Sequence, residues 1–120
     1  MAAKKKKKKA MPPAEPPRIH AASLASGPSG VVFKEAEIDL AAAIARRQAG
    51  LDIVVCGDGL RDNRNLARQI EAAVGPEQQE DPHKKAGPYS LPHFQQESRM
   101  LKGHSFYETD NPKRKARKLP

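Results

Sequence analysis

The stretch Leu51-Asp-Ile-Val-Val-Cys56, followed by Gly57-Asp58-Gly59, decides how this chain folds. It is a short, continuous apolar run with three β-branched residues in succession, which is typical of a buried strand. The two glycines then allow a tight turn from the strand into a helix. A strand followed by Gly-x-Gly and a helix also occurs at dinucleotide sites, but the third glycine of that fingerprint is absent. We therefore expect a buried strand and no cofactor site here.

One helix is expected on each side of this strand. Residues 35–49 place apolar side chains on one face, and Gly50 is well placed to end the helix. Residues 61–74 carry a second apolar stripe, and Gly75-Pro76 stops it. Because both helices are amphipathic, we expect each to pack its apolar side against the same core.

Three further short strands are expected, at residues 31–33, 91–95 and 104–108. The segment between residues 75 and 92 is polar or rich in Pro, Gly and Lys, which indicates a long loop. The order is then strand, helix, strand, helix, long loop, strand, strand. This predicts the α+β class, with two helices packed on a small sheet of short strands.

The two ends of the chain differ from its middle in composition. Residues 1–29 contain a lysine run, prolines and a Ser/Gly/Pro stretch, which predicts a disordered tail. Residues 111–120 hold five Lys or Arg and two prolines, which predicts a second, basic tail. A single small α+β domain is therefore expected over residues 30–110.

The net charge of +8 is concentrated in these tails. Residues 1–30 carry +6 and residues 111–120 carry +5, so the middle of the chain carries −3. Basic tails bind phosphate backbones without sequence preference and in a salt-dependent way, or they serve only to keep the chain in solution. No apolar stretch is long enough for a signal peptide or a membrane span, so we expect no membrane partner. The expected location is the cytoplasm, or export without a classical signal.

Cys56 is the only cysteine, so the chain can form no internal disulfide and no multi-cysteine zinc site. It stands in the apolar run that predicts the buried strand. We interpret it as a small buried hydrophobic residue rather than as a nucleophile.

Three of the four histidines, His83, His93 and His104, lie within twenty-two residues. If the strands that carry His93 and His104 pair, these two side chains approach each other across the ladder. Two histidines placed in this way suit RNA cleavage, because one can take a proton from the 2′-hydroxyl while the other protonates the leaving 5′-oxygen. His93 and His104 are the candidate acid/base pair, and His83 and Tyr107 are candidate auxiliary residues.

The charge that builds on the phosphoryl oxygens needs cationic donors. The candidate phosphate-binding residues are Lys84, Lys85, Arg61, Arg64 and Lys102. Arg61, Arg64 and Arg68 follow one flank of the second helix, and this row is either a solvated face or a ridge that contacts phosphate.

Two plainer readings of the histidines stay open. They can be polar surface or turn residues, or they can bind a metal together with Glu108 or Asp110. Their spacings of ten and eleven match no compact zinc pattern, so we expect no metal and no other cofactor.

The chain resembles the C-terminal toxin domains of bacterial polymorphic toxins, of the rearrangement-hotspot and contact-dependent types, over residues 52–108. The segments that carry the resemblance are Asp52-Ile-Val-Val-Cys-Gly57, Asn63-Arg64, Ile70-Glu-Ala-Ala-Val-Gly75, His83, Ala86-Gly87-Pro88, Leu91-Pro-His-Phe-Gln95 and Gly103-His-Ser-Phe-Tyr-Glu108. The resemblance implies a toxin-like domain, commonly a nuclease, with a cognate immunity protein as partner.

The leading hypothesis is a small toxin-like nuclease domain that cleaves RNA phosphodiesters without a metal. The alternative is a non-enzymatic interaction module whose basic tails bind nucleic acid or another polyanion. A third possibility is a protein-binding partner of a larger toxin apparatus.

Overall fold

The apolar run that follows Leu51 forms a buried strand at the centre of the protein. The computed structural model describes residues 16–25, 30–80, 89–98 and 100–119. Within it, Ile53–Cys56 is strand β4, and all four of its residues are buried, which confirms the expectation from the sequence. Strands β7 and β2 pair with the two edges of β4, and its side chains point alternately into two buried clusters, one on each face of the sheet.

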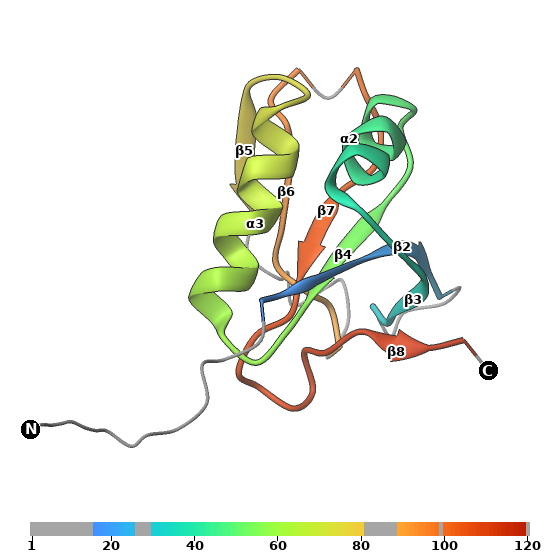
Figure 1. Ribbon diagram of the computed structural model, residues 1–120, viewed down its shortest axis with the longest axis vertical. Helices are drawn as coiled ribbons and strands as arrows, with labels where there is room; N and C mark the ends of the chain where they lie inside the picture. Colours follow the sequence, from blue (N-terminus) through green and yellow to red (C-terminus); the bar gives the residue numbers. More distant parts are fainter. Residues whose placement is uncertain (1–15, 26–29, 81–88, 99, 120) are drawn as a thin grey trace, which may run out of the picture.

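The described residues form two helices and a seven-stranded sheet, which confirms the α+β class (Figure 1). In chain order the elements are β2 (Arg18–Leu24), β3 (Val32–Ile38), α2 (Leu40–Gln48), β4 (Ile53–Cys56), α3 (Leu60–Ala72), β5 (Glu77–Glu80), β6 (His93–Gln96), β7 (Ser105–Tyr107) and β8 (Arg117–Lys118). The order of strands across the sheet is β5-β6-β7-β4-β2-β3-β8. The β4–β7 and β3–β8 pairs are parallel, and the other pairs are antiparallel.

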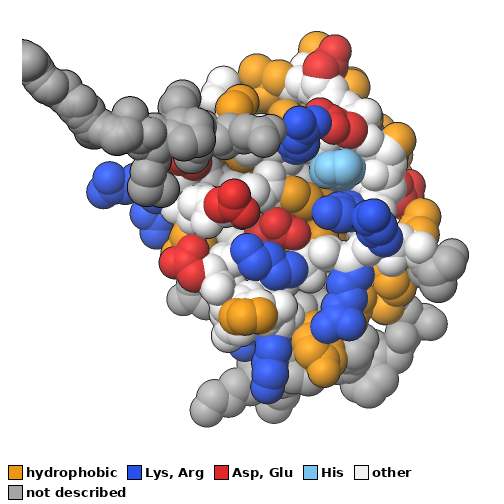
Figure 2. Space-filling model, turned by 60° about the horizontal axis from the view of Figure 1, so that its bottom comes forward, with side chains coloured by type: hydrophobic (Ala, Val, Ile, Leu, Met, Phe, Trp, Pro, Cys, Tyr) orange, Lys and Arg blue, Asp and Glu red, His pale blue; other side chains and the backbone are white. Residues whose placement is uncertain are grey.

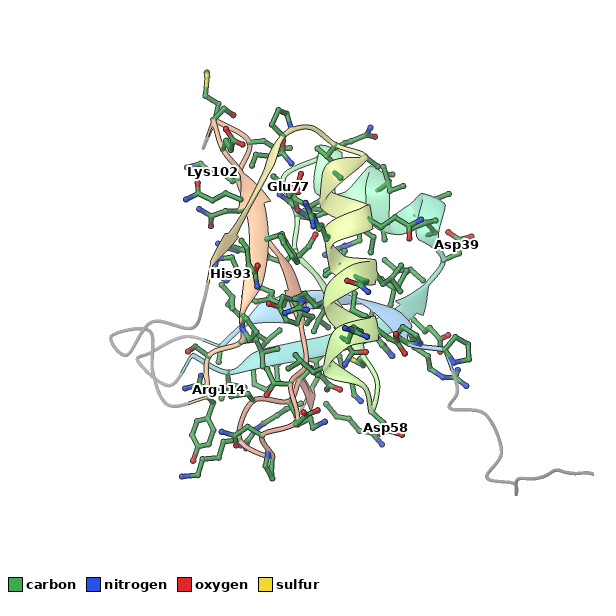
Figure 3. All side chains as sticks on the ribbon, turned by 90° about the vertical axis from the view of Figure 1, so that its left-hand side faces the viewer. Asp39, Asp58, Glu77, His93, Lys102 and Arg114 are labelled. Carbon is green, nitrogen blue, oxygen red and sulfur yellow. The ribbon has the colours of Figure 1, made fainter. Side chains whose placement is uncertain are left out.

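The sheet has one face covered by helices and one face without them, as Figures 1 and 3 show. On the helix face, Ile53 and Val55 of β4 pack with Ala67 and Ile70 of α3 and with Tyr107. On the opposite face, which we call the open face, a second cluster contains Val54, Cys56 and Phe106, together with Leu91 and Ala116. This alternation follows from the two-residue period of a strand.

The tail boundaries expected from the sequence are wrong at both ends. Residues 18–24, expected within a disordered segment, form β2, which pairs with both β3 and β4. Ile19, Ala21 and Ala22 of β2 are at most 7% exposed, so burial outweighs the unfavourable composition around them. At the other end Ala116 is buried and its N–H donates to Glu108 Oε2 at 2.9 Å, and β8 joins the sheet beside β3.

The helix expected over residues 35–49 begins later than expected. β3 continues to Ile38, because Val32–Ile38 pairs along β2 in place of turning into a helix. Asp39 then caps α2 by accepting a hydrogen bond from the N–H of Ala42 at 2.8 Å. The second helix, β6 and β7 lie close to their expected positions, whereas β5 lies in a segment expected to be a loop. β5 has no apolar pattern, and its pairing with β6 places it in the sheet.

A buried ion pair joins the helices to the sheet. Arg47 of α2 and Glu71 of α3 are fully buried, and Arg47 Nε donates to Glu71 Oε1 at 2.7 Å. Glu71 also accepts hydrogen bonds from Gln96 and from the hydroxyl of Ser105. Arg47 Nη1 donates in addition to the carbonyls of Leu51 and Lys102 at 3.0 and 2.9 Å. The charges are therefore satisfied inside the protein, as buried charges must be.

Candidate functional site

The structure brings His93 and His104 together on the open face of the sheet. His93 begins β6 and pairs with Phe106 of β7, and His104 stands directly before β7. The two imidazole rings have centroids 4.6 Å apart and meet edge to face at 77°. The centroid of the Phe106 ring lies 5.3 Å from that of His93 and 5.0 Å from that of His104, so Phe106 packs against both imidazoles. The pairing of the two strands that the sequence suggested is thus observed.

Asp52 completes the arrangement, although sequence reasoning did not single it out. Its Oδ1 atom accepts the backbone N–H of His104 at 2.8 Å and lies 3.0 Å from His104 Nδ1. A carboxylate oxygen accepts, so Nδ1 carries the hydrogen and Nε2 is the ring atom left to exchange a proton. The side chains of His104 and Asp52 are 32% and 20% exposed, so solvent and a substrate can reach the pair.

The parallel pairing of β4 with β7 explains this contact. Ile53 lies opposite Ser105 in the register, and the residues before them are Asp52 and His104. An acidic residue directly before a buried strand is a signal that the sequence contains. Its partner depends on which strands pair and in which direction, and the sequence does not show that.

His93 is held by oxygen atoms on both sides of its ring. Its Nε2 atom lies 3.1 Å from Oε1 of Gln95, and its Nδ1 atom lies 3.5 Å from the carbonyl oxygen of Leu91. Both oxygens accept, so the doubly protonated ring can donate to each of them.

A hollow of about 290 Å³ adjoins this pair, lined by Gln95, Gln96, Leu101, Lys102, Gly103 and His104. Lys102 is exposed and is the cation at this hollow among the described residues. In Figure 3 His93 and Lys102 both lie on the side of the sheet away from α3. Gly103 has a φ of 94°, and a Cβ there would meet the carbonyl oxygen of Gly50 at 2.8 Å. Only glycine fits there, so Gly103 determines how His104 is presented.

Other candidates from the sequence do not join this site. Tyr107 points to the helix face, is 2% exposed, and its hydroxyl accepts a hydrogen bond from Gln79 Nε2 at 2.8 Å. Strand alternation places it on the face opposite to Phe106, so Tyr107 does not lie beside the histidines. Arg61 and Arg64 lie exposed on α3, which covers that same helix face. His83, Lys84 and Lys85 lie outside the described residues.

Cys56 is buried, which confirms the structural role expected for it. Burial, reinforced by the nearby charge of Glu108, raises the pKa of its thiol to about 12. A thiol with this pKa stays protonated at neutral pH and is a poor nucleophile. Glu108 is itself occupied, since its carboxylate accepts the backbone N–H groups of Gly57 and Ala116.

In the described part of the chain, no group of three or more His, Cys, Asp or Glu is arranged to hold a metal ion. The described residues also form no helix that is long and apolar enough to cross a membrane.

The chain matches no protein-family model, no curated protein and no solved structure. The function of the histidine pair is therefore argued from its geometry.

Proposed function

We propose that the protein is a toxin-like ribonuclease in which His93 and His104 act as a metal-independent acid/base pair. The observation that carries the proposal is the contact of the two imidazole rings, with centroids 4.6 Å apart, beside a carboxylate that holds one of them. A solvent-accessible pair of histidines, one of them oriented by a carboxylate, is the arrangement that general acid/base catalysis requires.

In the proposed reaction His104 is the base. Its Nε2 atom takes the proton of the ribose 2′-hydroxyl, and the 2′-oxygen attacks the adjacent phosphorus. Asp52 stabilises the imidazolium that forms, because its carboxylate accepts the Nδ1 hydrogen at 3.0 Å. His93 gives a proton to the 5′-oxygen as the bond between phosphorus and that oxygen breaks. The products are a 2′,3′-cyclic phosphate and a 5′-hydroxyl.

Lys102 supplies positive charge for the phosphoryl oxygens in this proposal. It lines the hollow next to His104, and its exposed side chain is free to turn toward a bound phosphate. A cation aimed at oxygens that gain charge in the transition state lowers the barrier, and its effect is greatest where water is excluded.

The resemblance to polymorphic toxin domains supports the same activity and adds a partner. A toxin that cleaves RNA must be inhibited in the cell that makes it, and an immunity protein does this by binding its cognate domain. An acidic protein that covers the open face at His93, His104 and Lys102 would block access of RNA.

The test is RNA cleavage by purified His93→Ala and His104→Ala. Each substitution is expected to lower the cleavage rate by about a hundredfold to ten-thousandfold, because it removes one proton-transfer group. His20→Ala is the matched control, since His20 lies on β2 and bonds only the carbonyl of Glu35 among the contacts described. Cleavage retained in both variants, or equal cleavage of a 2′-deoxy substrate, contradicts the proposal.

A second function has its own support in the C-terminal segment. Arg117 lies over the ring of Tyr89 at 4.6 Å, and Lys113, Arg117 and Lys118 are exposed. Basic side chains held on a folded frame can bind nucleic acid without any cleavage. If Lys113→Gln, Arg117→Gln and Lys118→Gln together abolish RNA binding, and no cleavage is seen, the interaction module is favoured over the nuclease.

A further inference from the structure

We propose a second site, formed by Arg64 and Arg114, that binds the phosphate group of a nucleotide or of an RNA strand. The site is a hollow of about 330 Å³ between α3 and the chain after β7. Neither His93 nor His104 lines it, whereas Arg64, one of the α3 arginines for which the sequence suggested phosphate contact, does.

The chemistry of the lining favours an anion. Two guanidinium groups and the polar side chains of Gln79, Tyr107 and Thr109 line the hollow, and none of its lining residues is acidic. Two cations that share one hollow repel each other unless an anion lies between them. Arginine presents a planar set of donors that matches phosphate, so phosphate is the anion that this lining fits best.

Arg114 is held in place before any ligand arrives. Its Nη1 atom donates to the carbonyl and to the hydroxyl of Ser90, and its backbone N–H donates to the carbonyl of Asn111 at 2.9 Å. The N–H of Thr109 donates in turn to the carbonyl of Arg114 at 3.2 Å, which closes a turn. Both side-chain bonds use Nη1, so within the described residues Nε and Nη2 remain available for a ligand. A cation fixed in this way loses little side-chain entropy on binding.

The arginines of α3 differ in their surroundings. Arg68 is already neutralised, because its Nε donates to Glu77 at 3.0 Å. Arg64 lines the hollow and makes no ion pair with any residue that the structure describes. Arg61 is exposed but does not line the hollow. Of this row, Arg64 is therefore the one placed to share a ligand with Arg114.

The size and the remaining walls indicate that more than a bare phosphate fits. The volume of about 330 Å³ lies at the lower end of the range of small-molecule sites. Leu60 and Pro92 provide apolar walls against which a sugar or base could rest. Pro92, which lines the hollow, directly precedes His93 in the sequence. Tyr107, which also lines the hollow, belongs to the helix-face cluster, so the hollow lies toward the helix face and not the open face.

Calorimetric titration with inorganic phosphate, adenosine 5′-monophosphate and single-stranded RNA tests the site. Arg64→Gln is expected to weaken binding by about tenfold to a hundredfold, the effect of removing one hydrogen bond to a charged group. Arg114→Lys is expected to weaken it similarly, since Lys keeps the charge but loses the planar donors. The probe that binds most tightly identifies the source of the phosphate.

Two controls separate this site from surface charge and from the nuclease proposal. Arg61→Gln removes the same charge from the same helix and should leave binding unchanged. In the His93→Ala/His104→Ala background, which lacks the proposed acid/base pair and so leaves the RNA probe intact, Arg64→Gln should still weaken binding by the same factor. In a Tyr89→Phe background Tyr107 is the only tyrosine and the chain has no tryptophan, so its fluorescence should change when the hollow fills. No binding of any probe, or equal weakening by Arg61→Gln and Arg64→Gln, overturns the proposal.

Discussion

On each face of the sheet a carboxylate meets a basic side chain, and these two contacts differ in exposure. On the helix face, Arg47 and Glu71 are both 0% exposed and meet at 2.7 Å. On the open face, His104 and Asp52 are 32% and 20% exposed and meet at 3.0 Å. The first cannot exchange protons with solvent, whereas the second can.

The buried contact stabilises the fold, whereas the exposed contact is available to take part in a reaction. A buried ion pair is costly to break, because the remaining charge stays uncompensated in a medium of low dielectric constant. A half-exposed pair costs less to break, and it can gain or lose a proton during a reaction. The two contacts are also linked, since Arg47 donates to the carbonyls of Leu51 and Lys102 beside the segments that carry Asp52 and His104.

The largest effect is expected from removing the buried carboxylate. Glu71→Ala leaves Arg47 without its partner and should lower the free energy of unfolding by about 3–5 kcal/mol. Urea denaturation followed by circular dichroism measures the loss. The double variant Arg47→Met/Glu71→Leu removes both charges, and it should recover much of that stability. A single variant as stable as the parent protein would show that the pair has no such role.

The exposed contact should instead affect activity. Asp52→Asn removes the charge that stabilises a protonated His104 and should lower RNA cleavage by about tenfold to a hundredfold. The free energy of unfolding should change by much less than it does in Glu71→Ala. Comparison of cleavage rates with urea midpoints for the two variants checks the division directly. If Asp52→Asn unfolds the protein and leaves the specific activity of the folded fraction unchanged, the two faces do not differ as described.

A pH experiment tests the buried cluster on the open face. The folded pKa of Cys56, about 12, lies above its ordinary value of 9.0, so its contribution to stability is complete below pH 9. Above pH 9 the unfolded thiol ionises while the folded one does not, and stability should fall by about 1.4 kcal/mol per pH unit toward pH 12. Urea titrations at pH 8, 9 and 10 should show this added slope relative to Cys56→Ala. Equal slopes for both proteins would mean that the thiol is accessible in the folded state.

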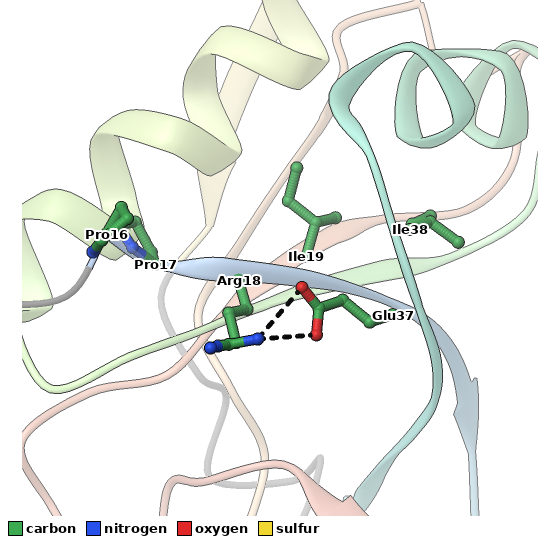
Figure 4. Close-up of a pocket in the computed structure, with 6 residues that line it drawn as sticks. All are labelled: Pro16, Pro17, Arg18, Ile19, Glu37 and Ile38. Carbon is green, nitrogen blue, oxygen red and sulfur yellow. Dashed lines mark hydrogen bonds and ion pairs between the residues drawn. The ribbon is translucent and has the colours of Figure 1, made fainter.

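The smallest effect is expected from a fully solvated pair. Arg18 and Glu37 meet at 3.0 Å beside a hollow of about 310 Å³, with side chains 58% and 49% exposed (Figure 4). Glu37→Gln should change the free energy of unfolding by less than about 1 kcal/mol, and the change should shrink further at high salt. If Glu37→Gln lowers the free energy of unfolding by more than this in the same urea assay, solvent exposure does not determine how much each ion pair stabilises the protein.

Charge on the surface is less segregated than the composition indicates. Figure 2 shows one face on which Lys and Arg side chains alternate with Asp and Glu. The basic residues from Lys113 to Lys118 belong to the folded part of the protein, because Ala116 is buried and β8 joins β3. Substitution of exposed lysines therefore tests nucleic-acid binding better than truncation does.

Whether a contact in the site could be predicted depends on how far apart its two residues lie in the sequence. The approach of His93 to His104 follows from two nearby strands that pair, and the sequence suggested it. Asp52 and Gly103 could not be assigned in the same way, since one depends on a parallel pairing across fifty-two residues and the other on contact with Gly50. Tyr107 lies on the helix face, as the alternation of side chains along a strand predicts, and so it does not lie beside the histidine pair.

The elements with strong local signals could be predicted from the sequence alone. The β-branched run makes β4, the apolar stripe makes α3, and Gly50, with a φ of 80°, follows the end of α2, because these features depend on residues a few positions apart. Contacts in the folded chain bring residues 18–24 into the sheet and set β4 parallel to β7. They also place Arg47 against Glu71 out of contact with water. These outcomes depend on long-range burial, which outweighs local preference when apolar surface on both partners leaves water together.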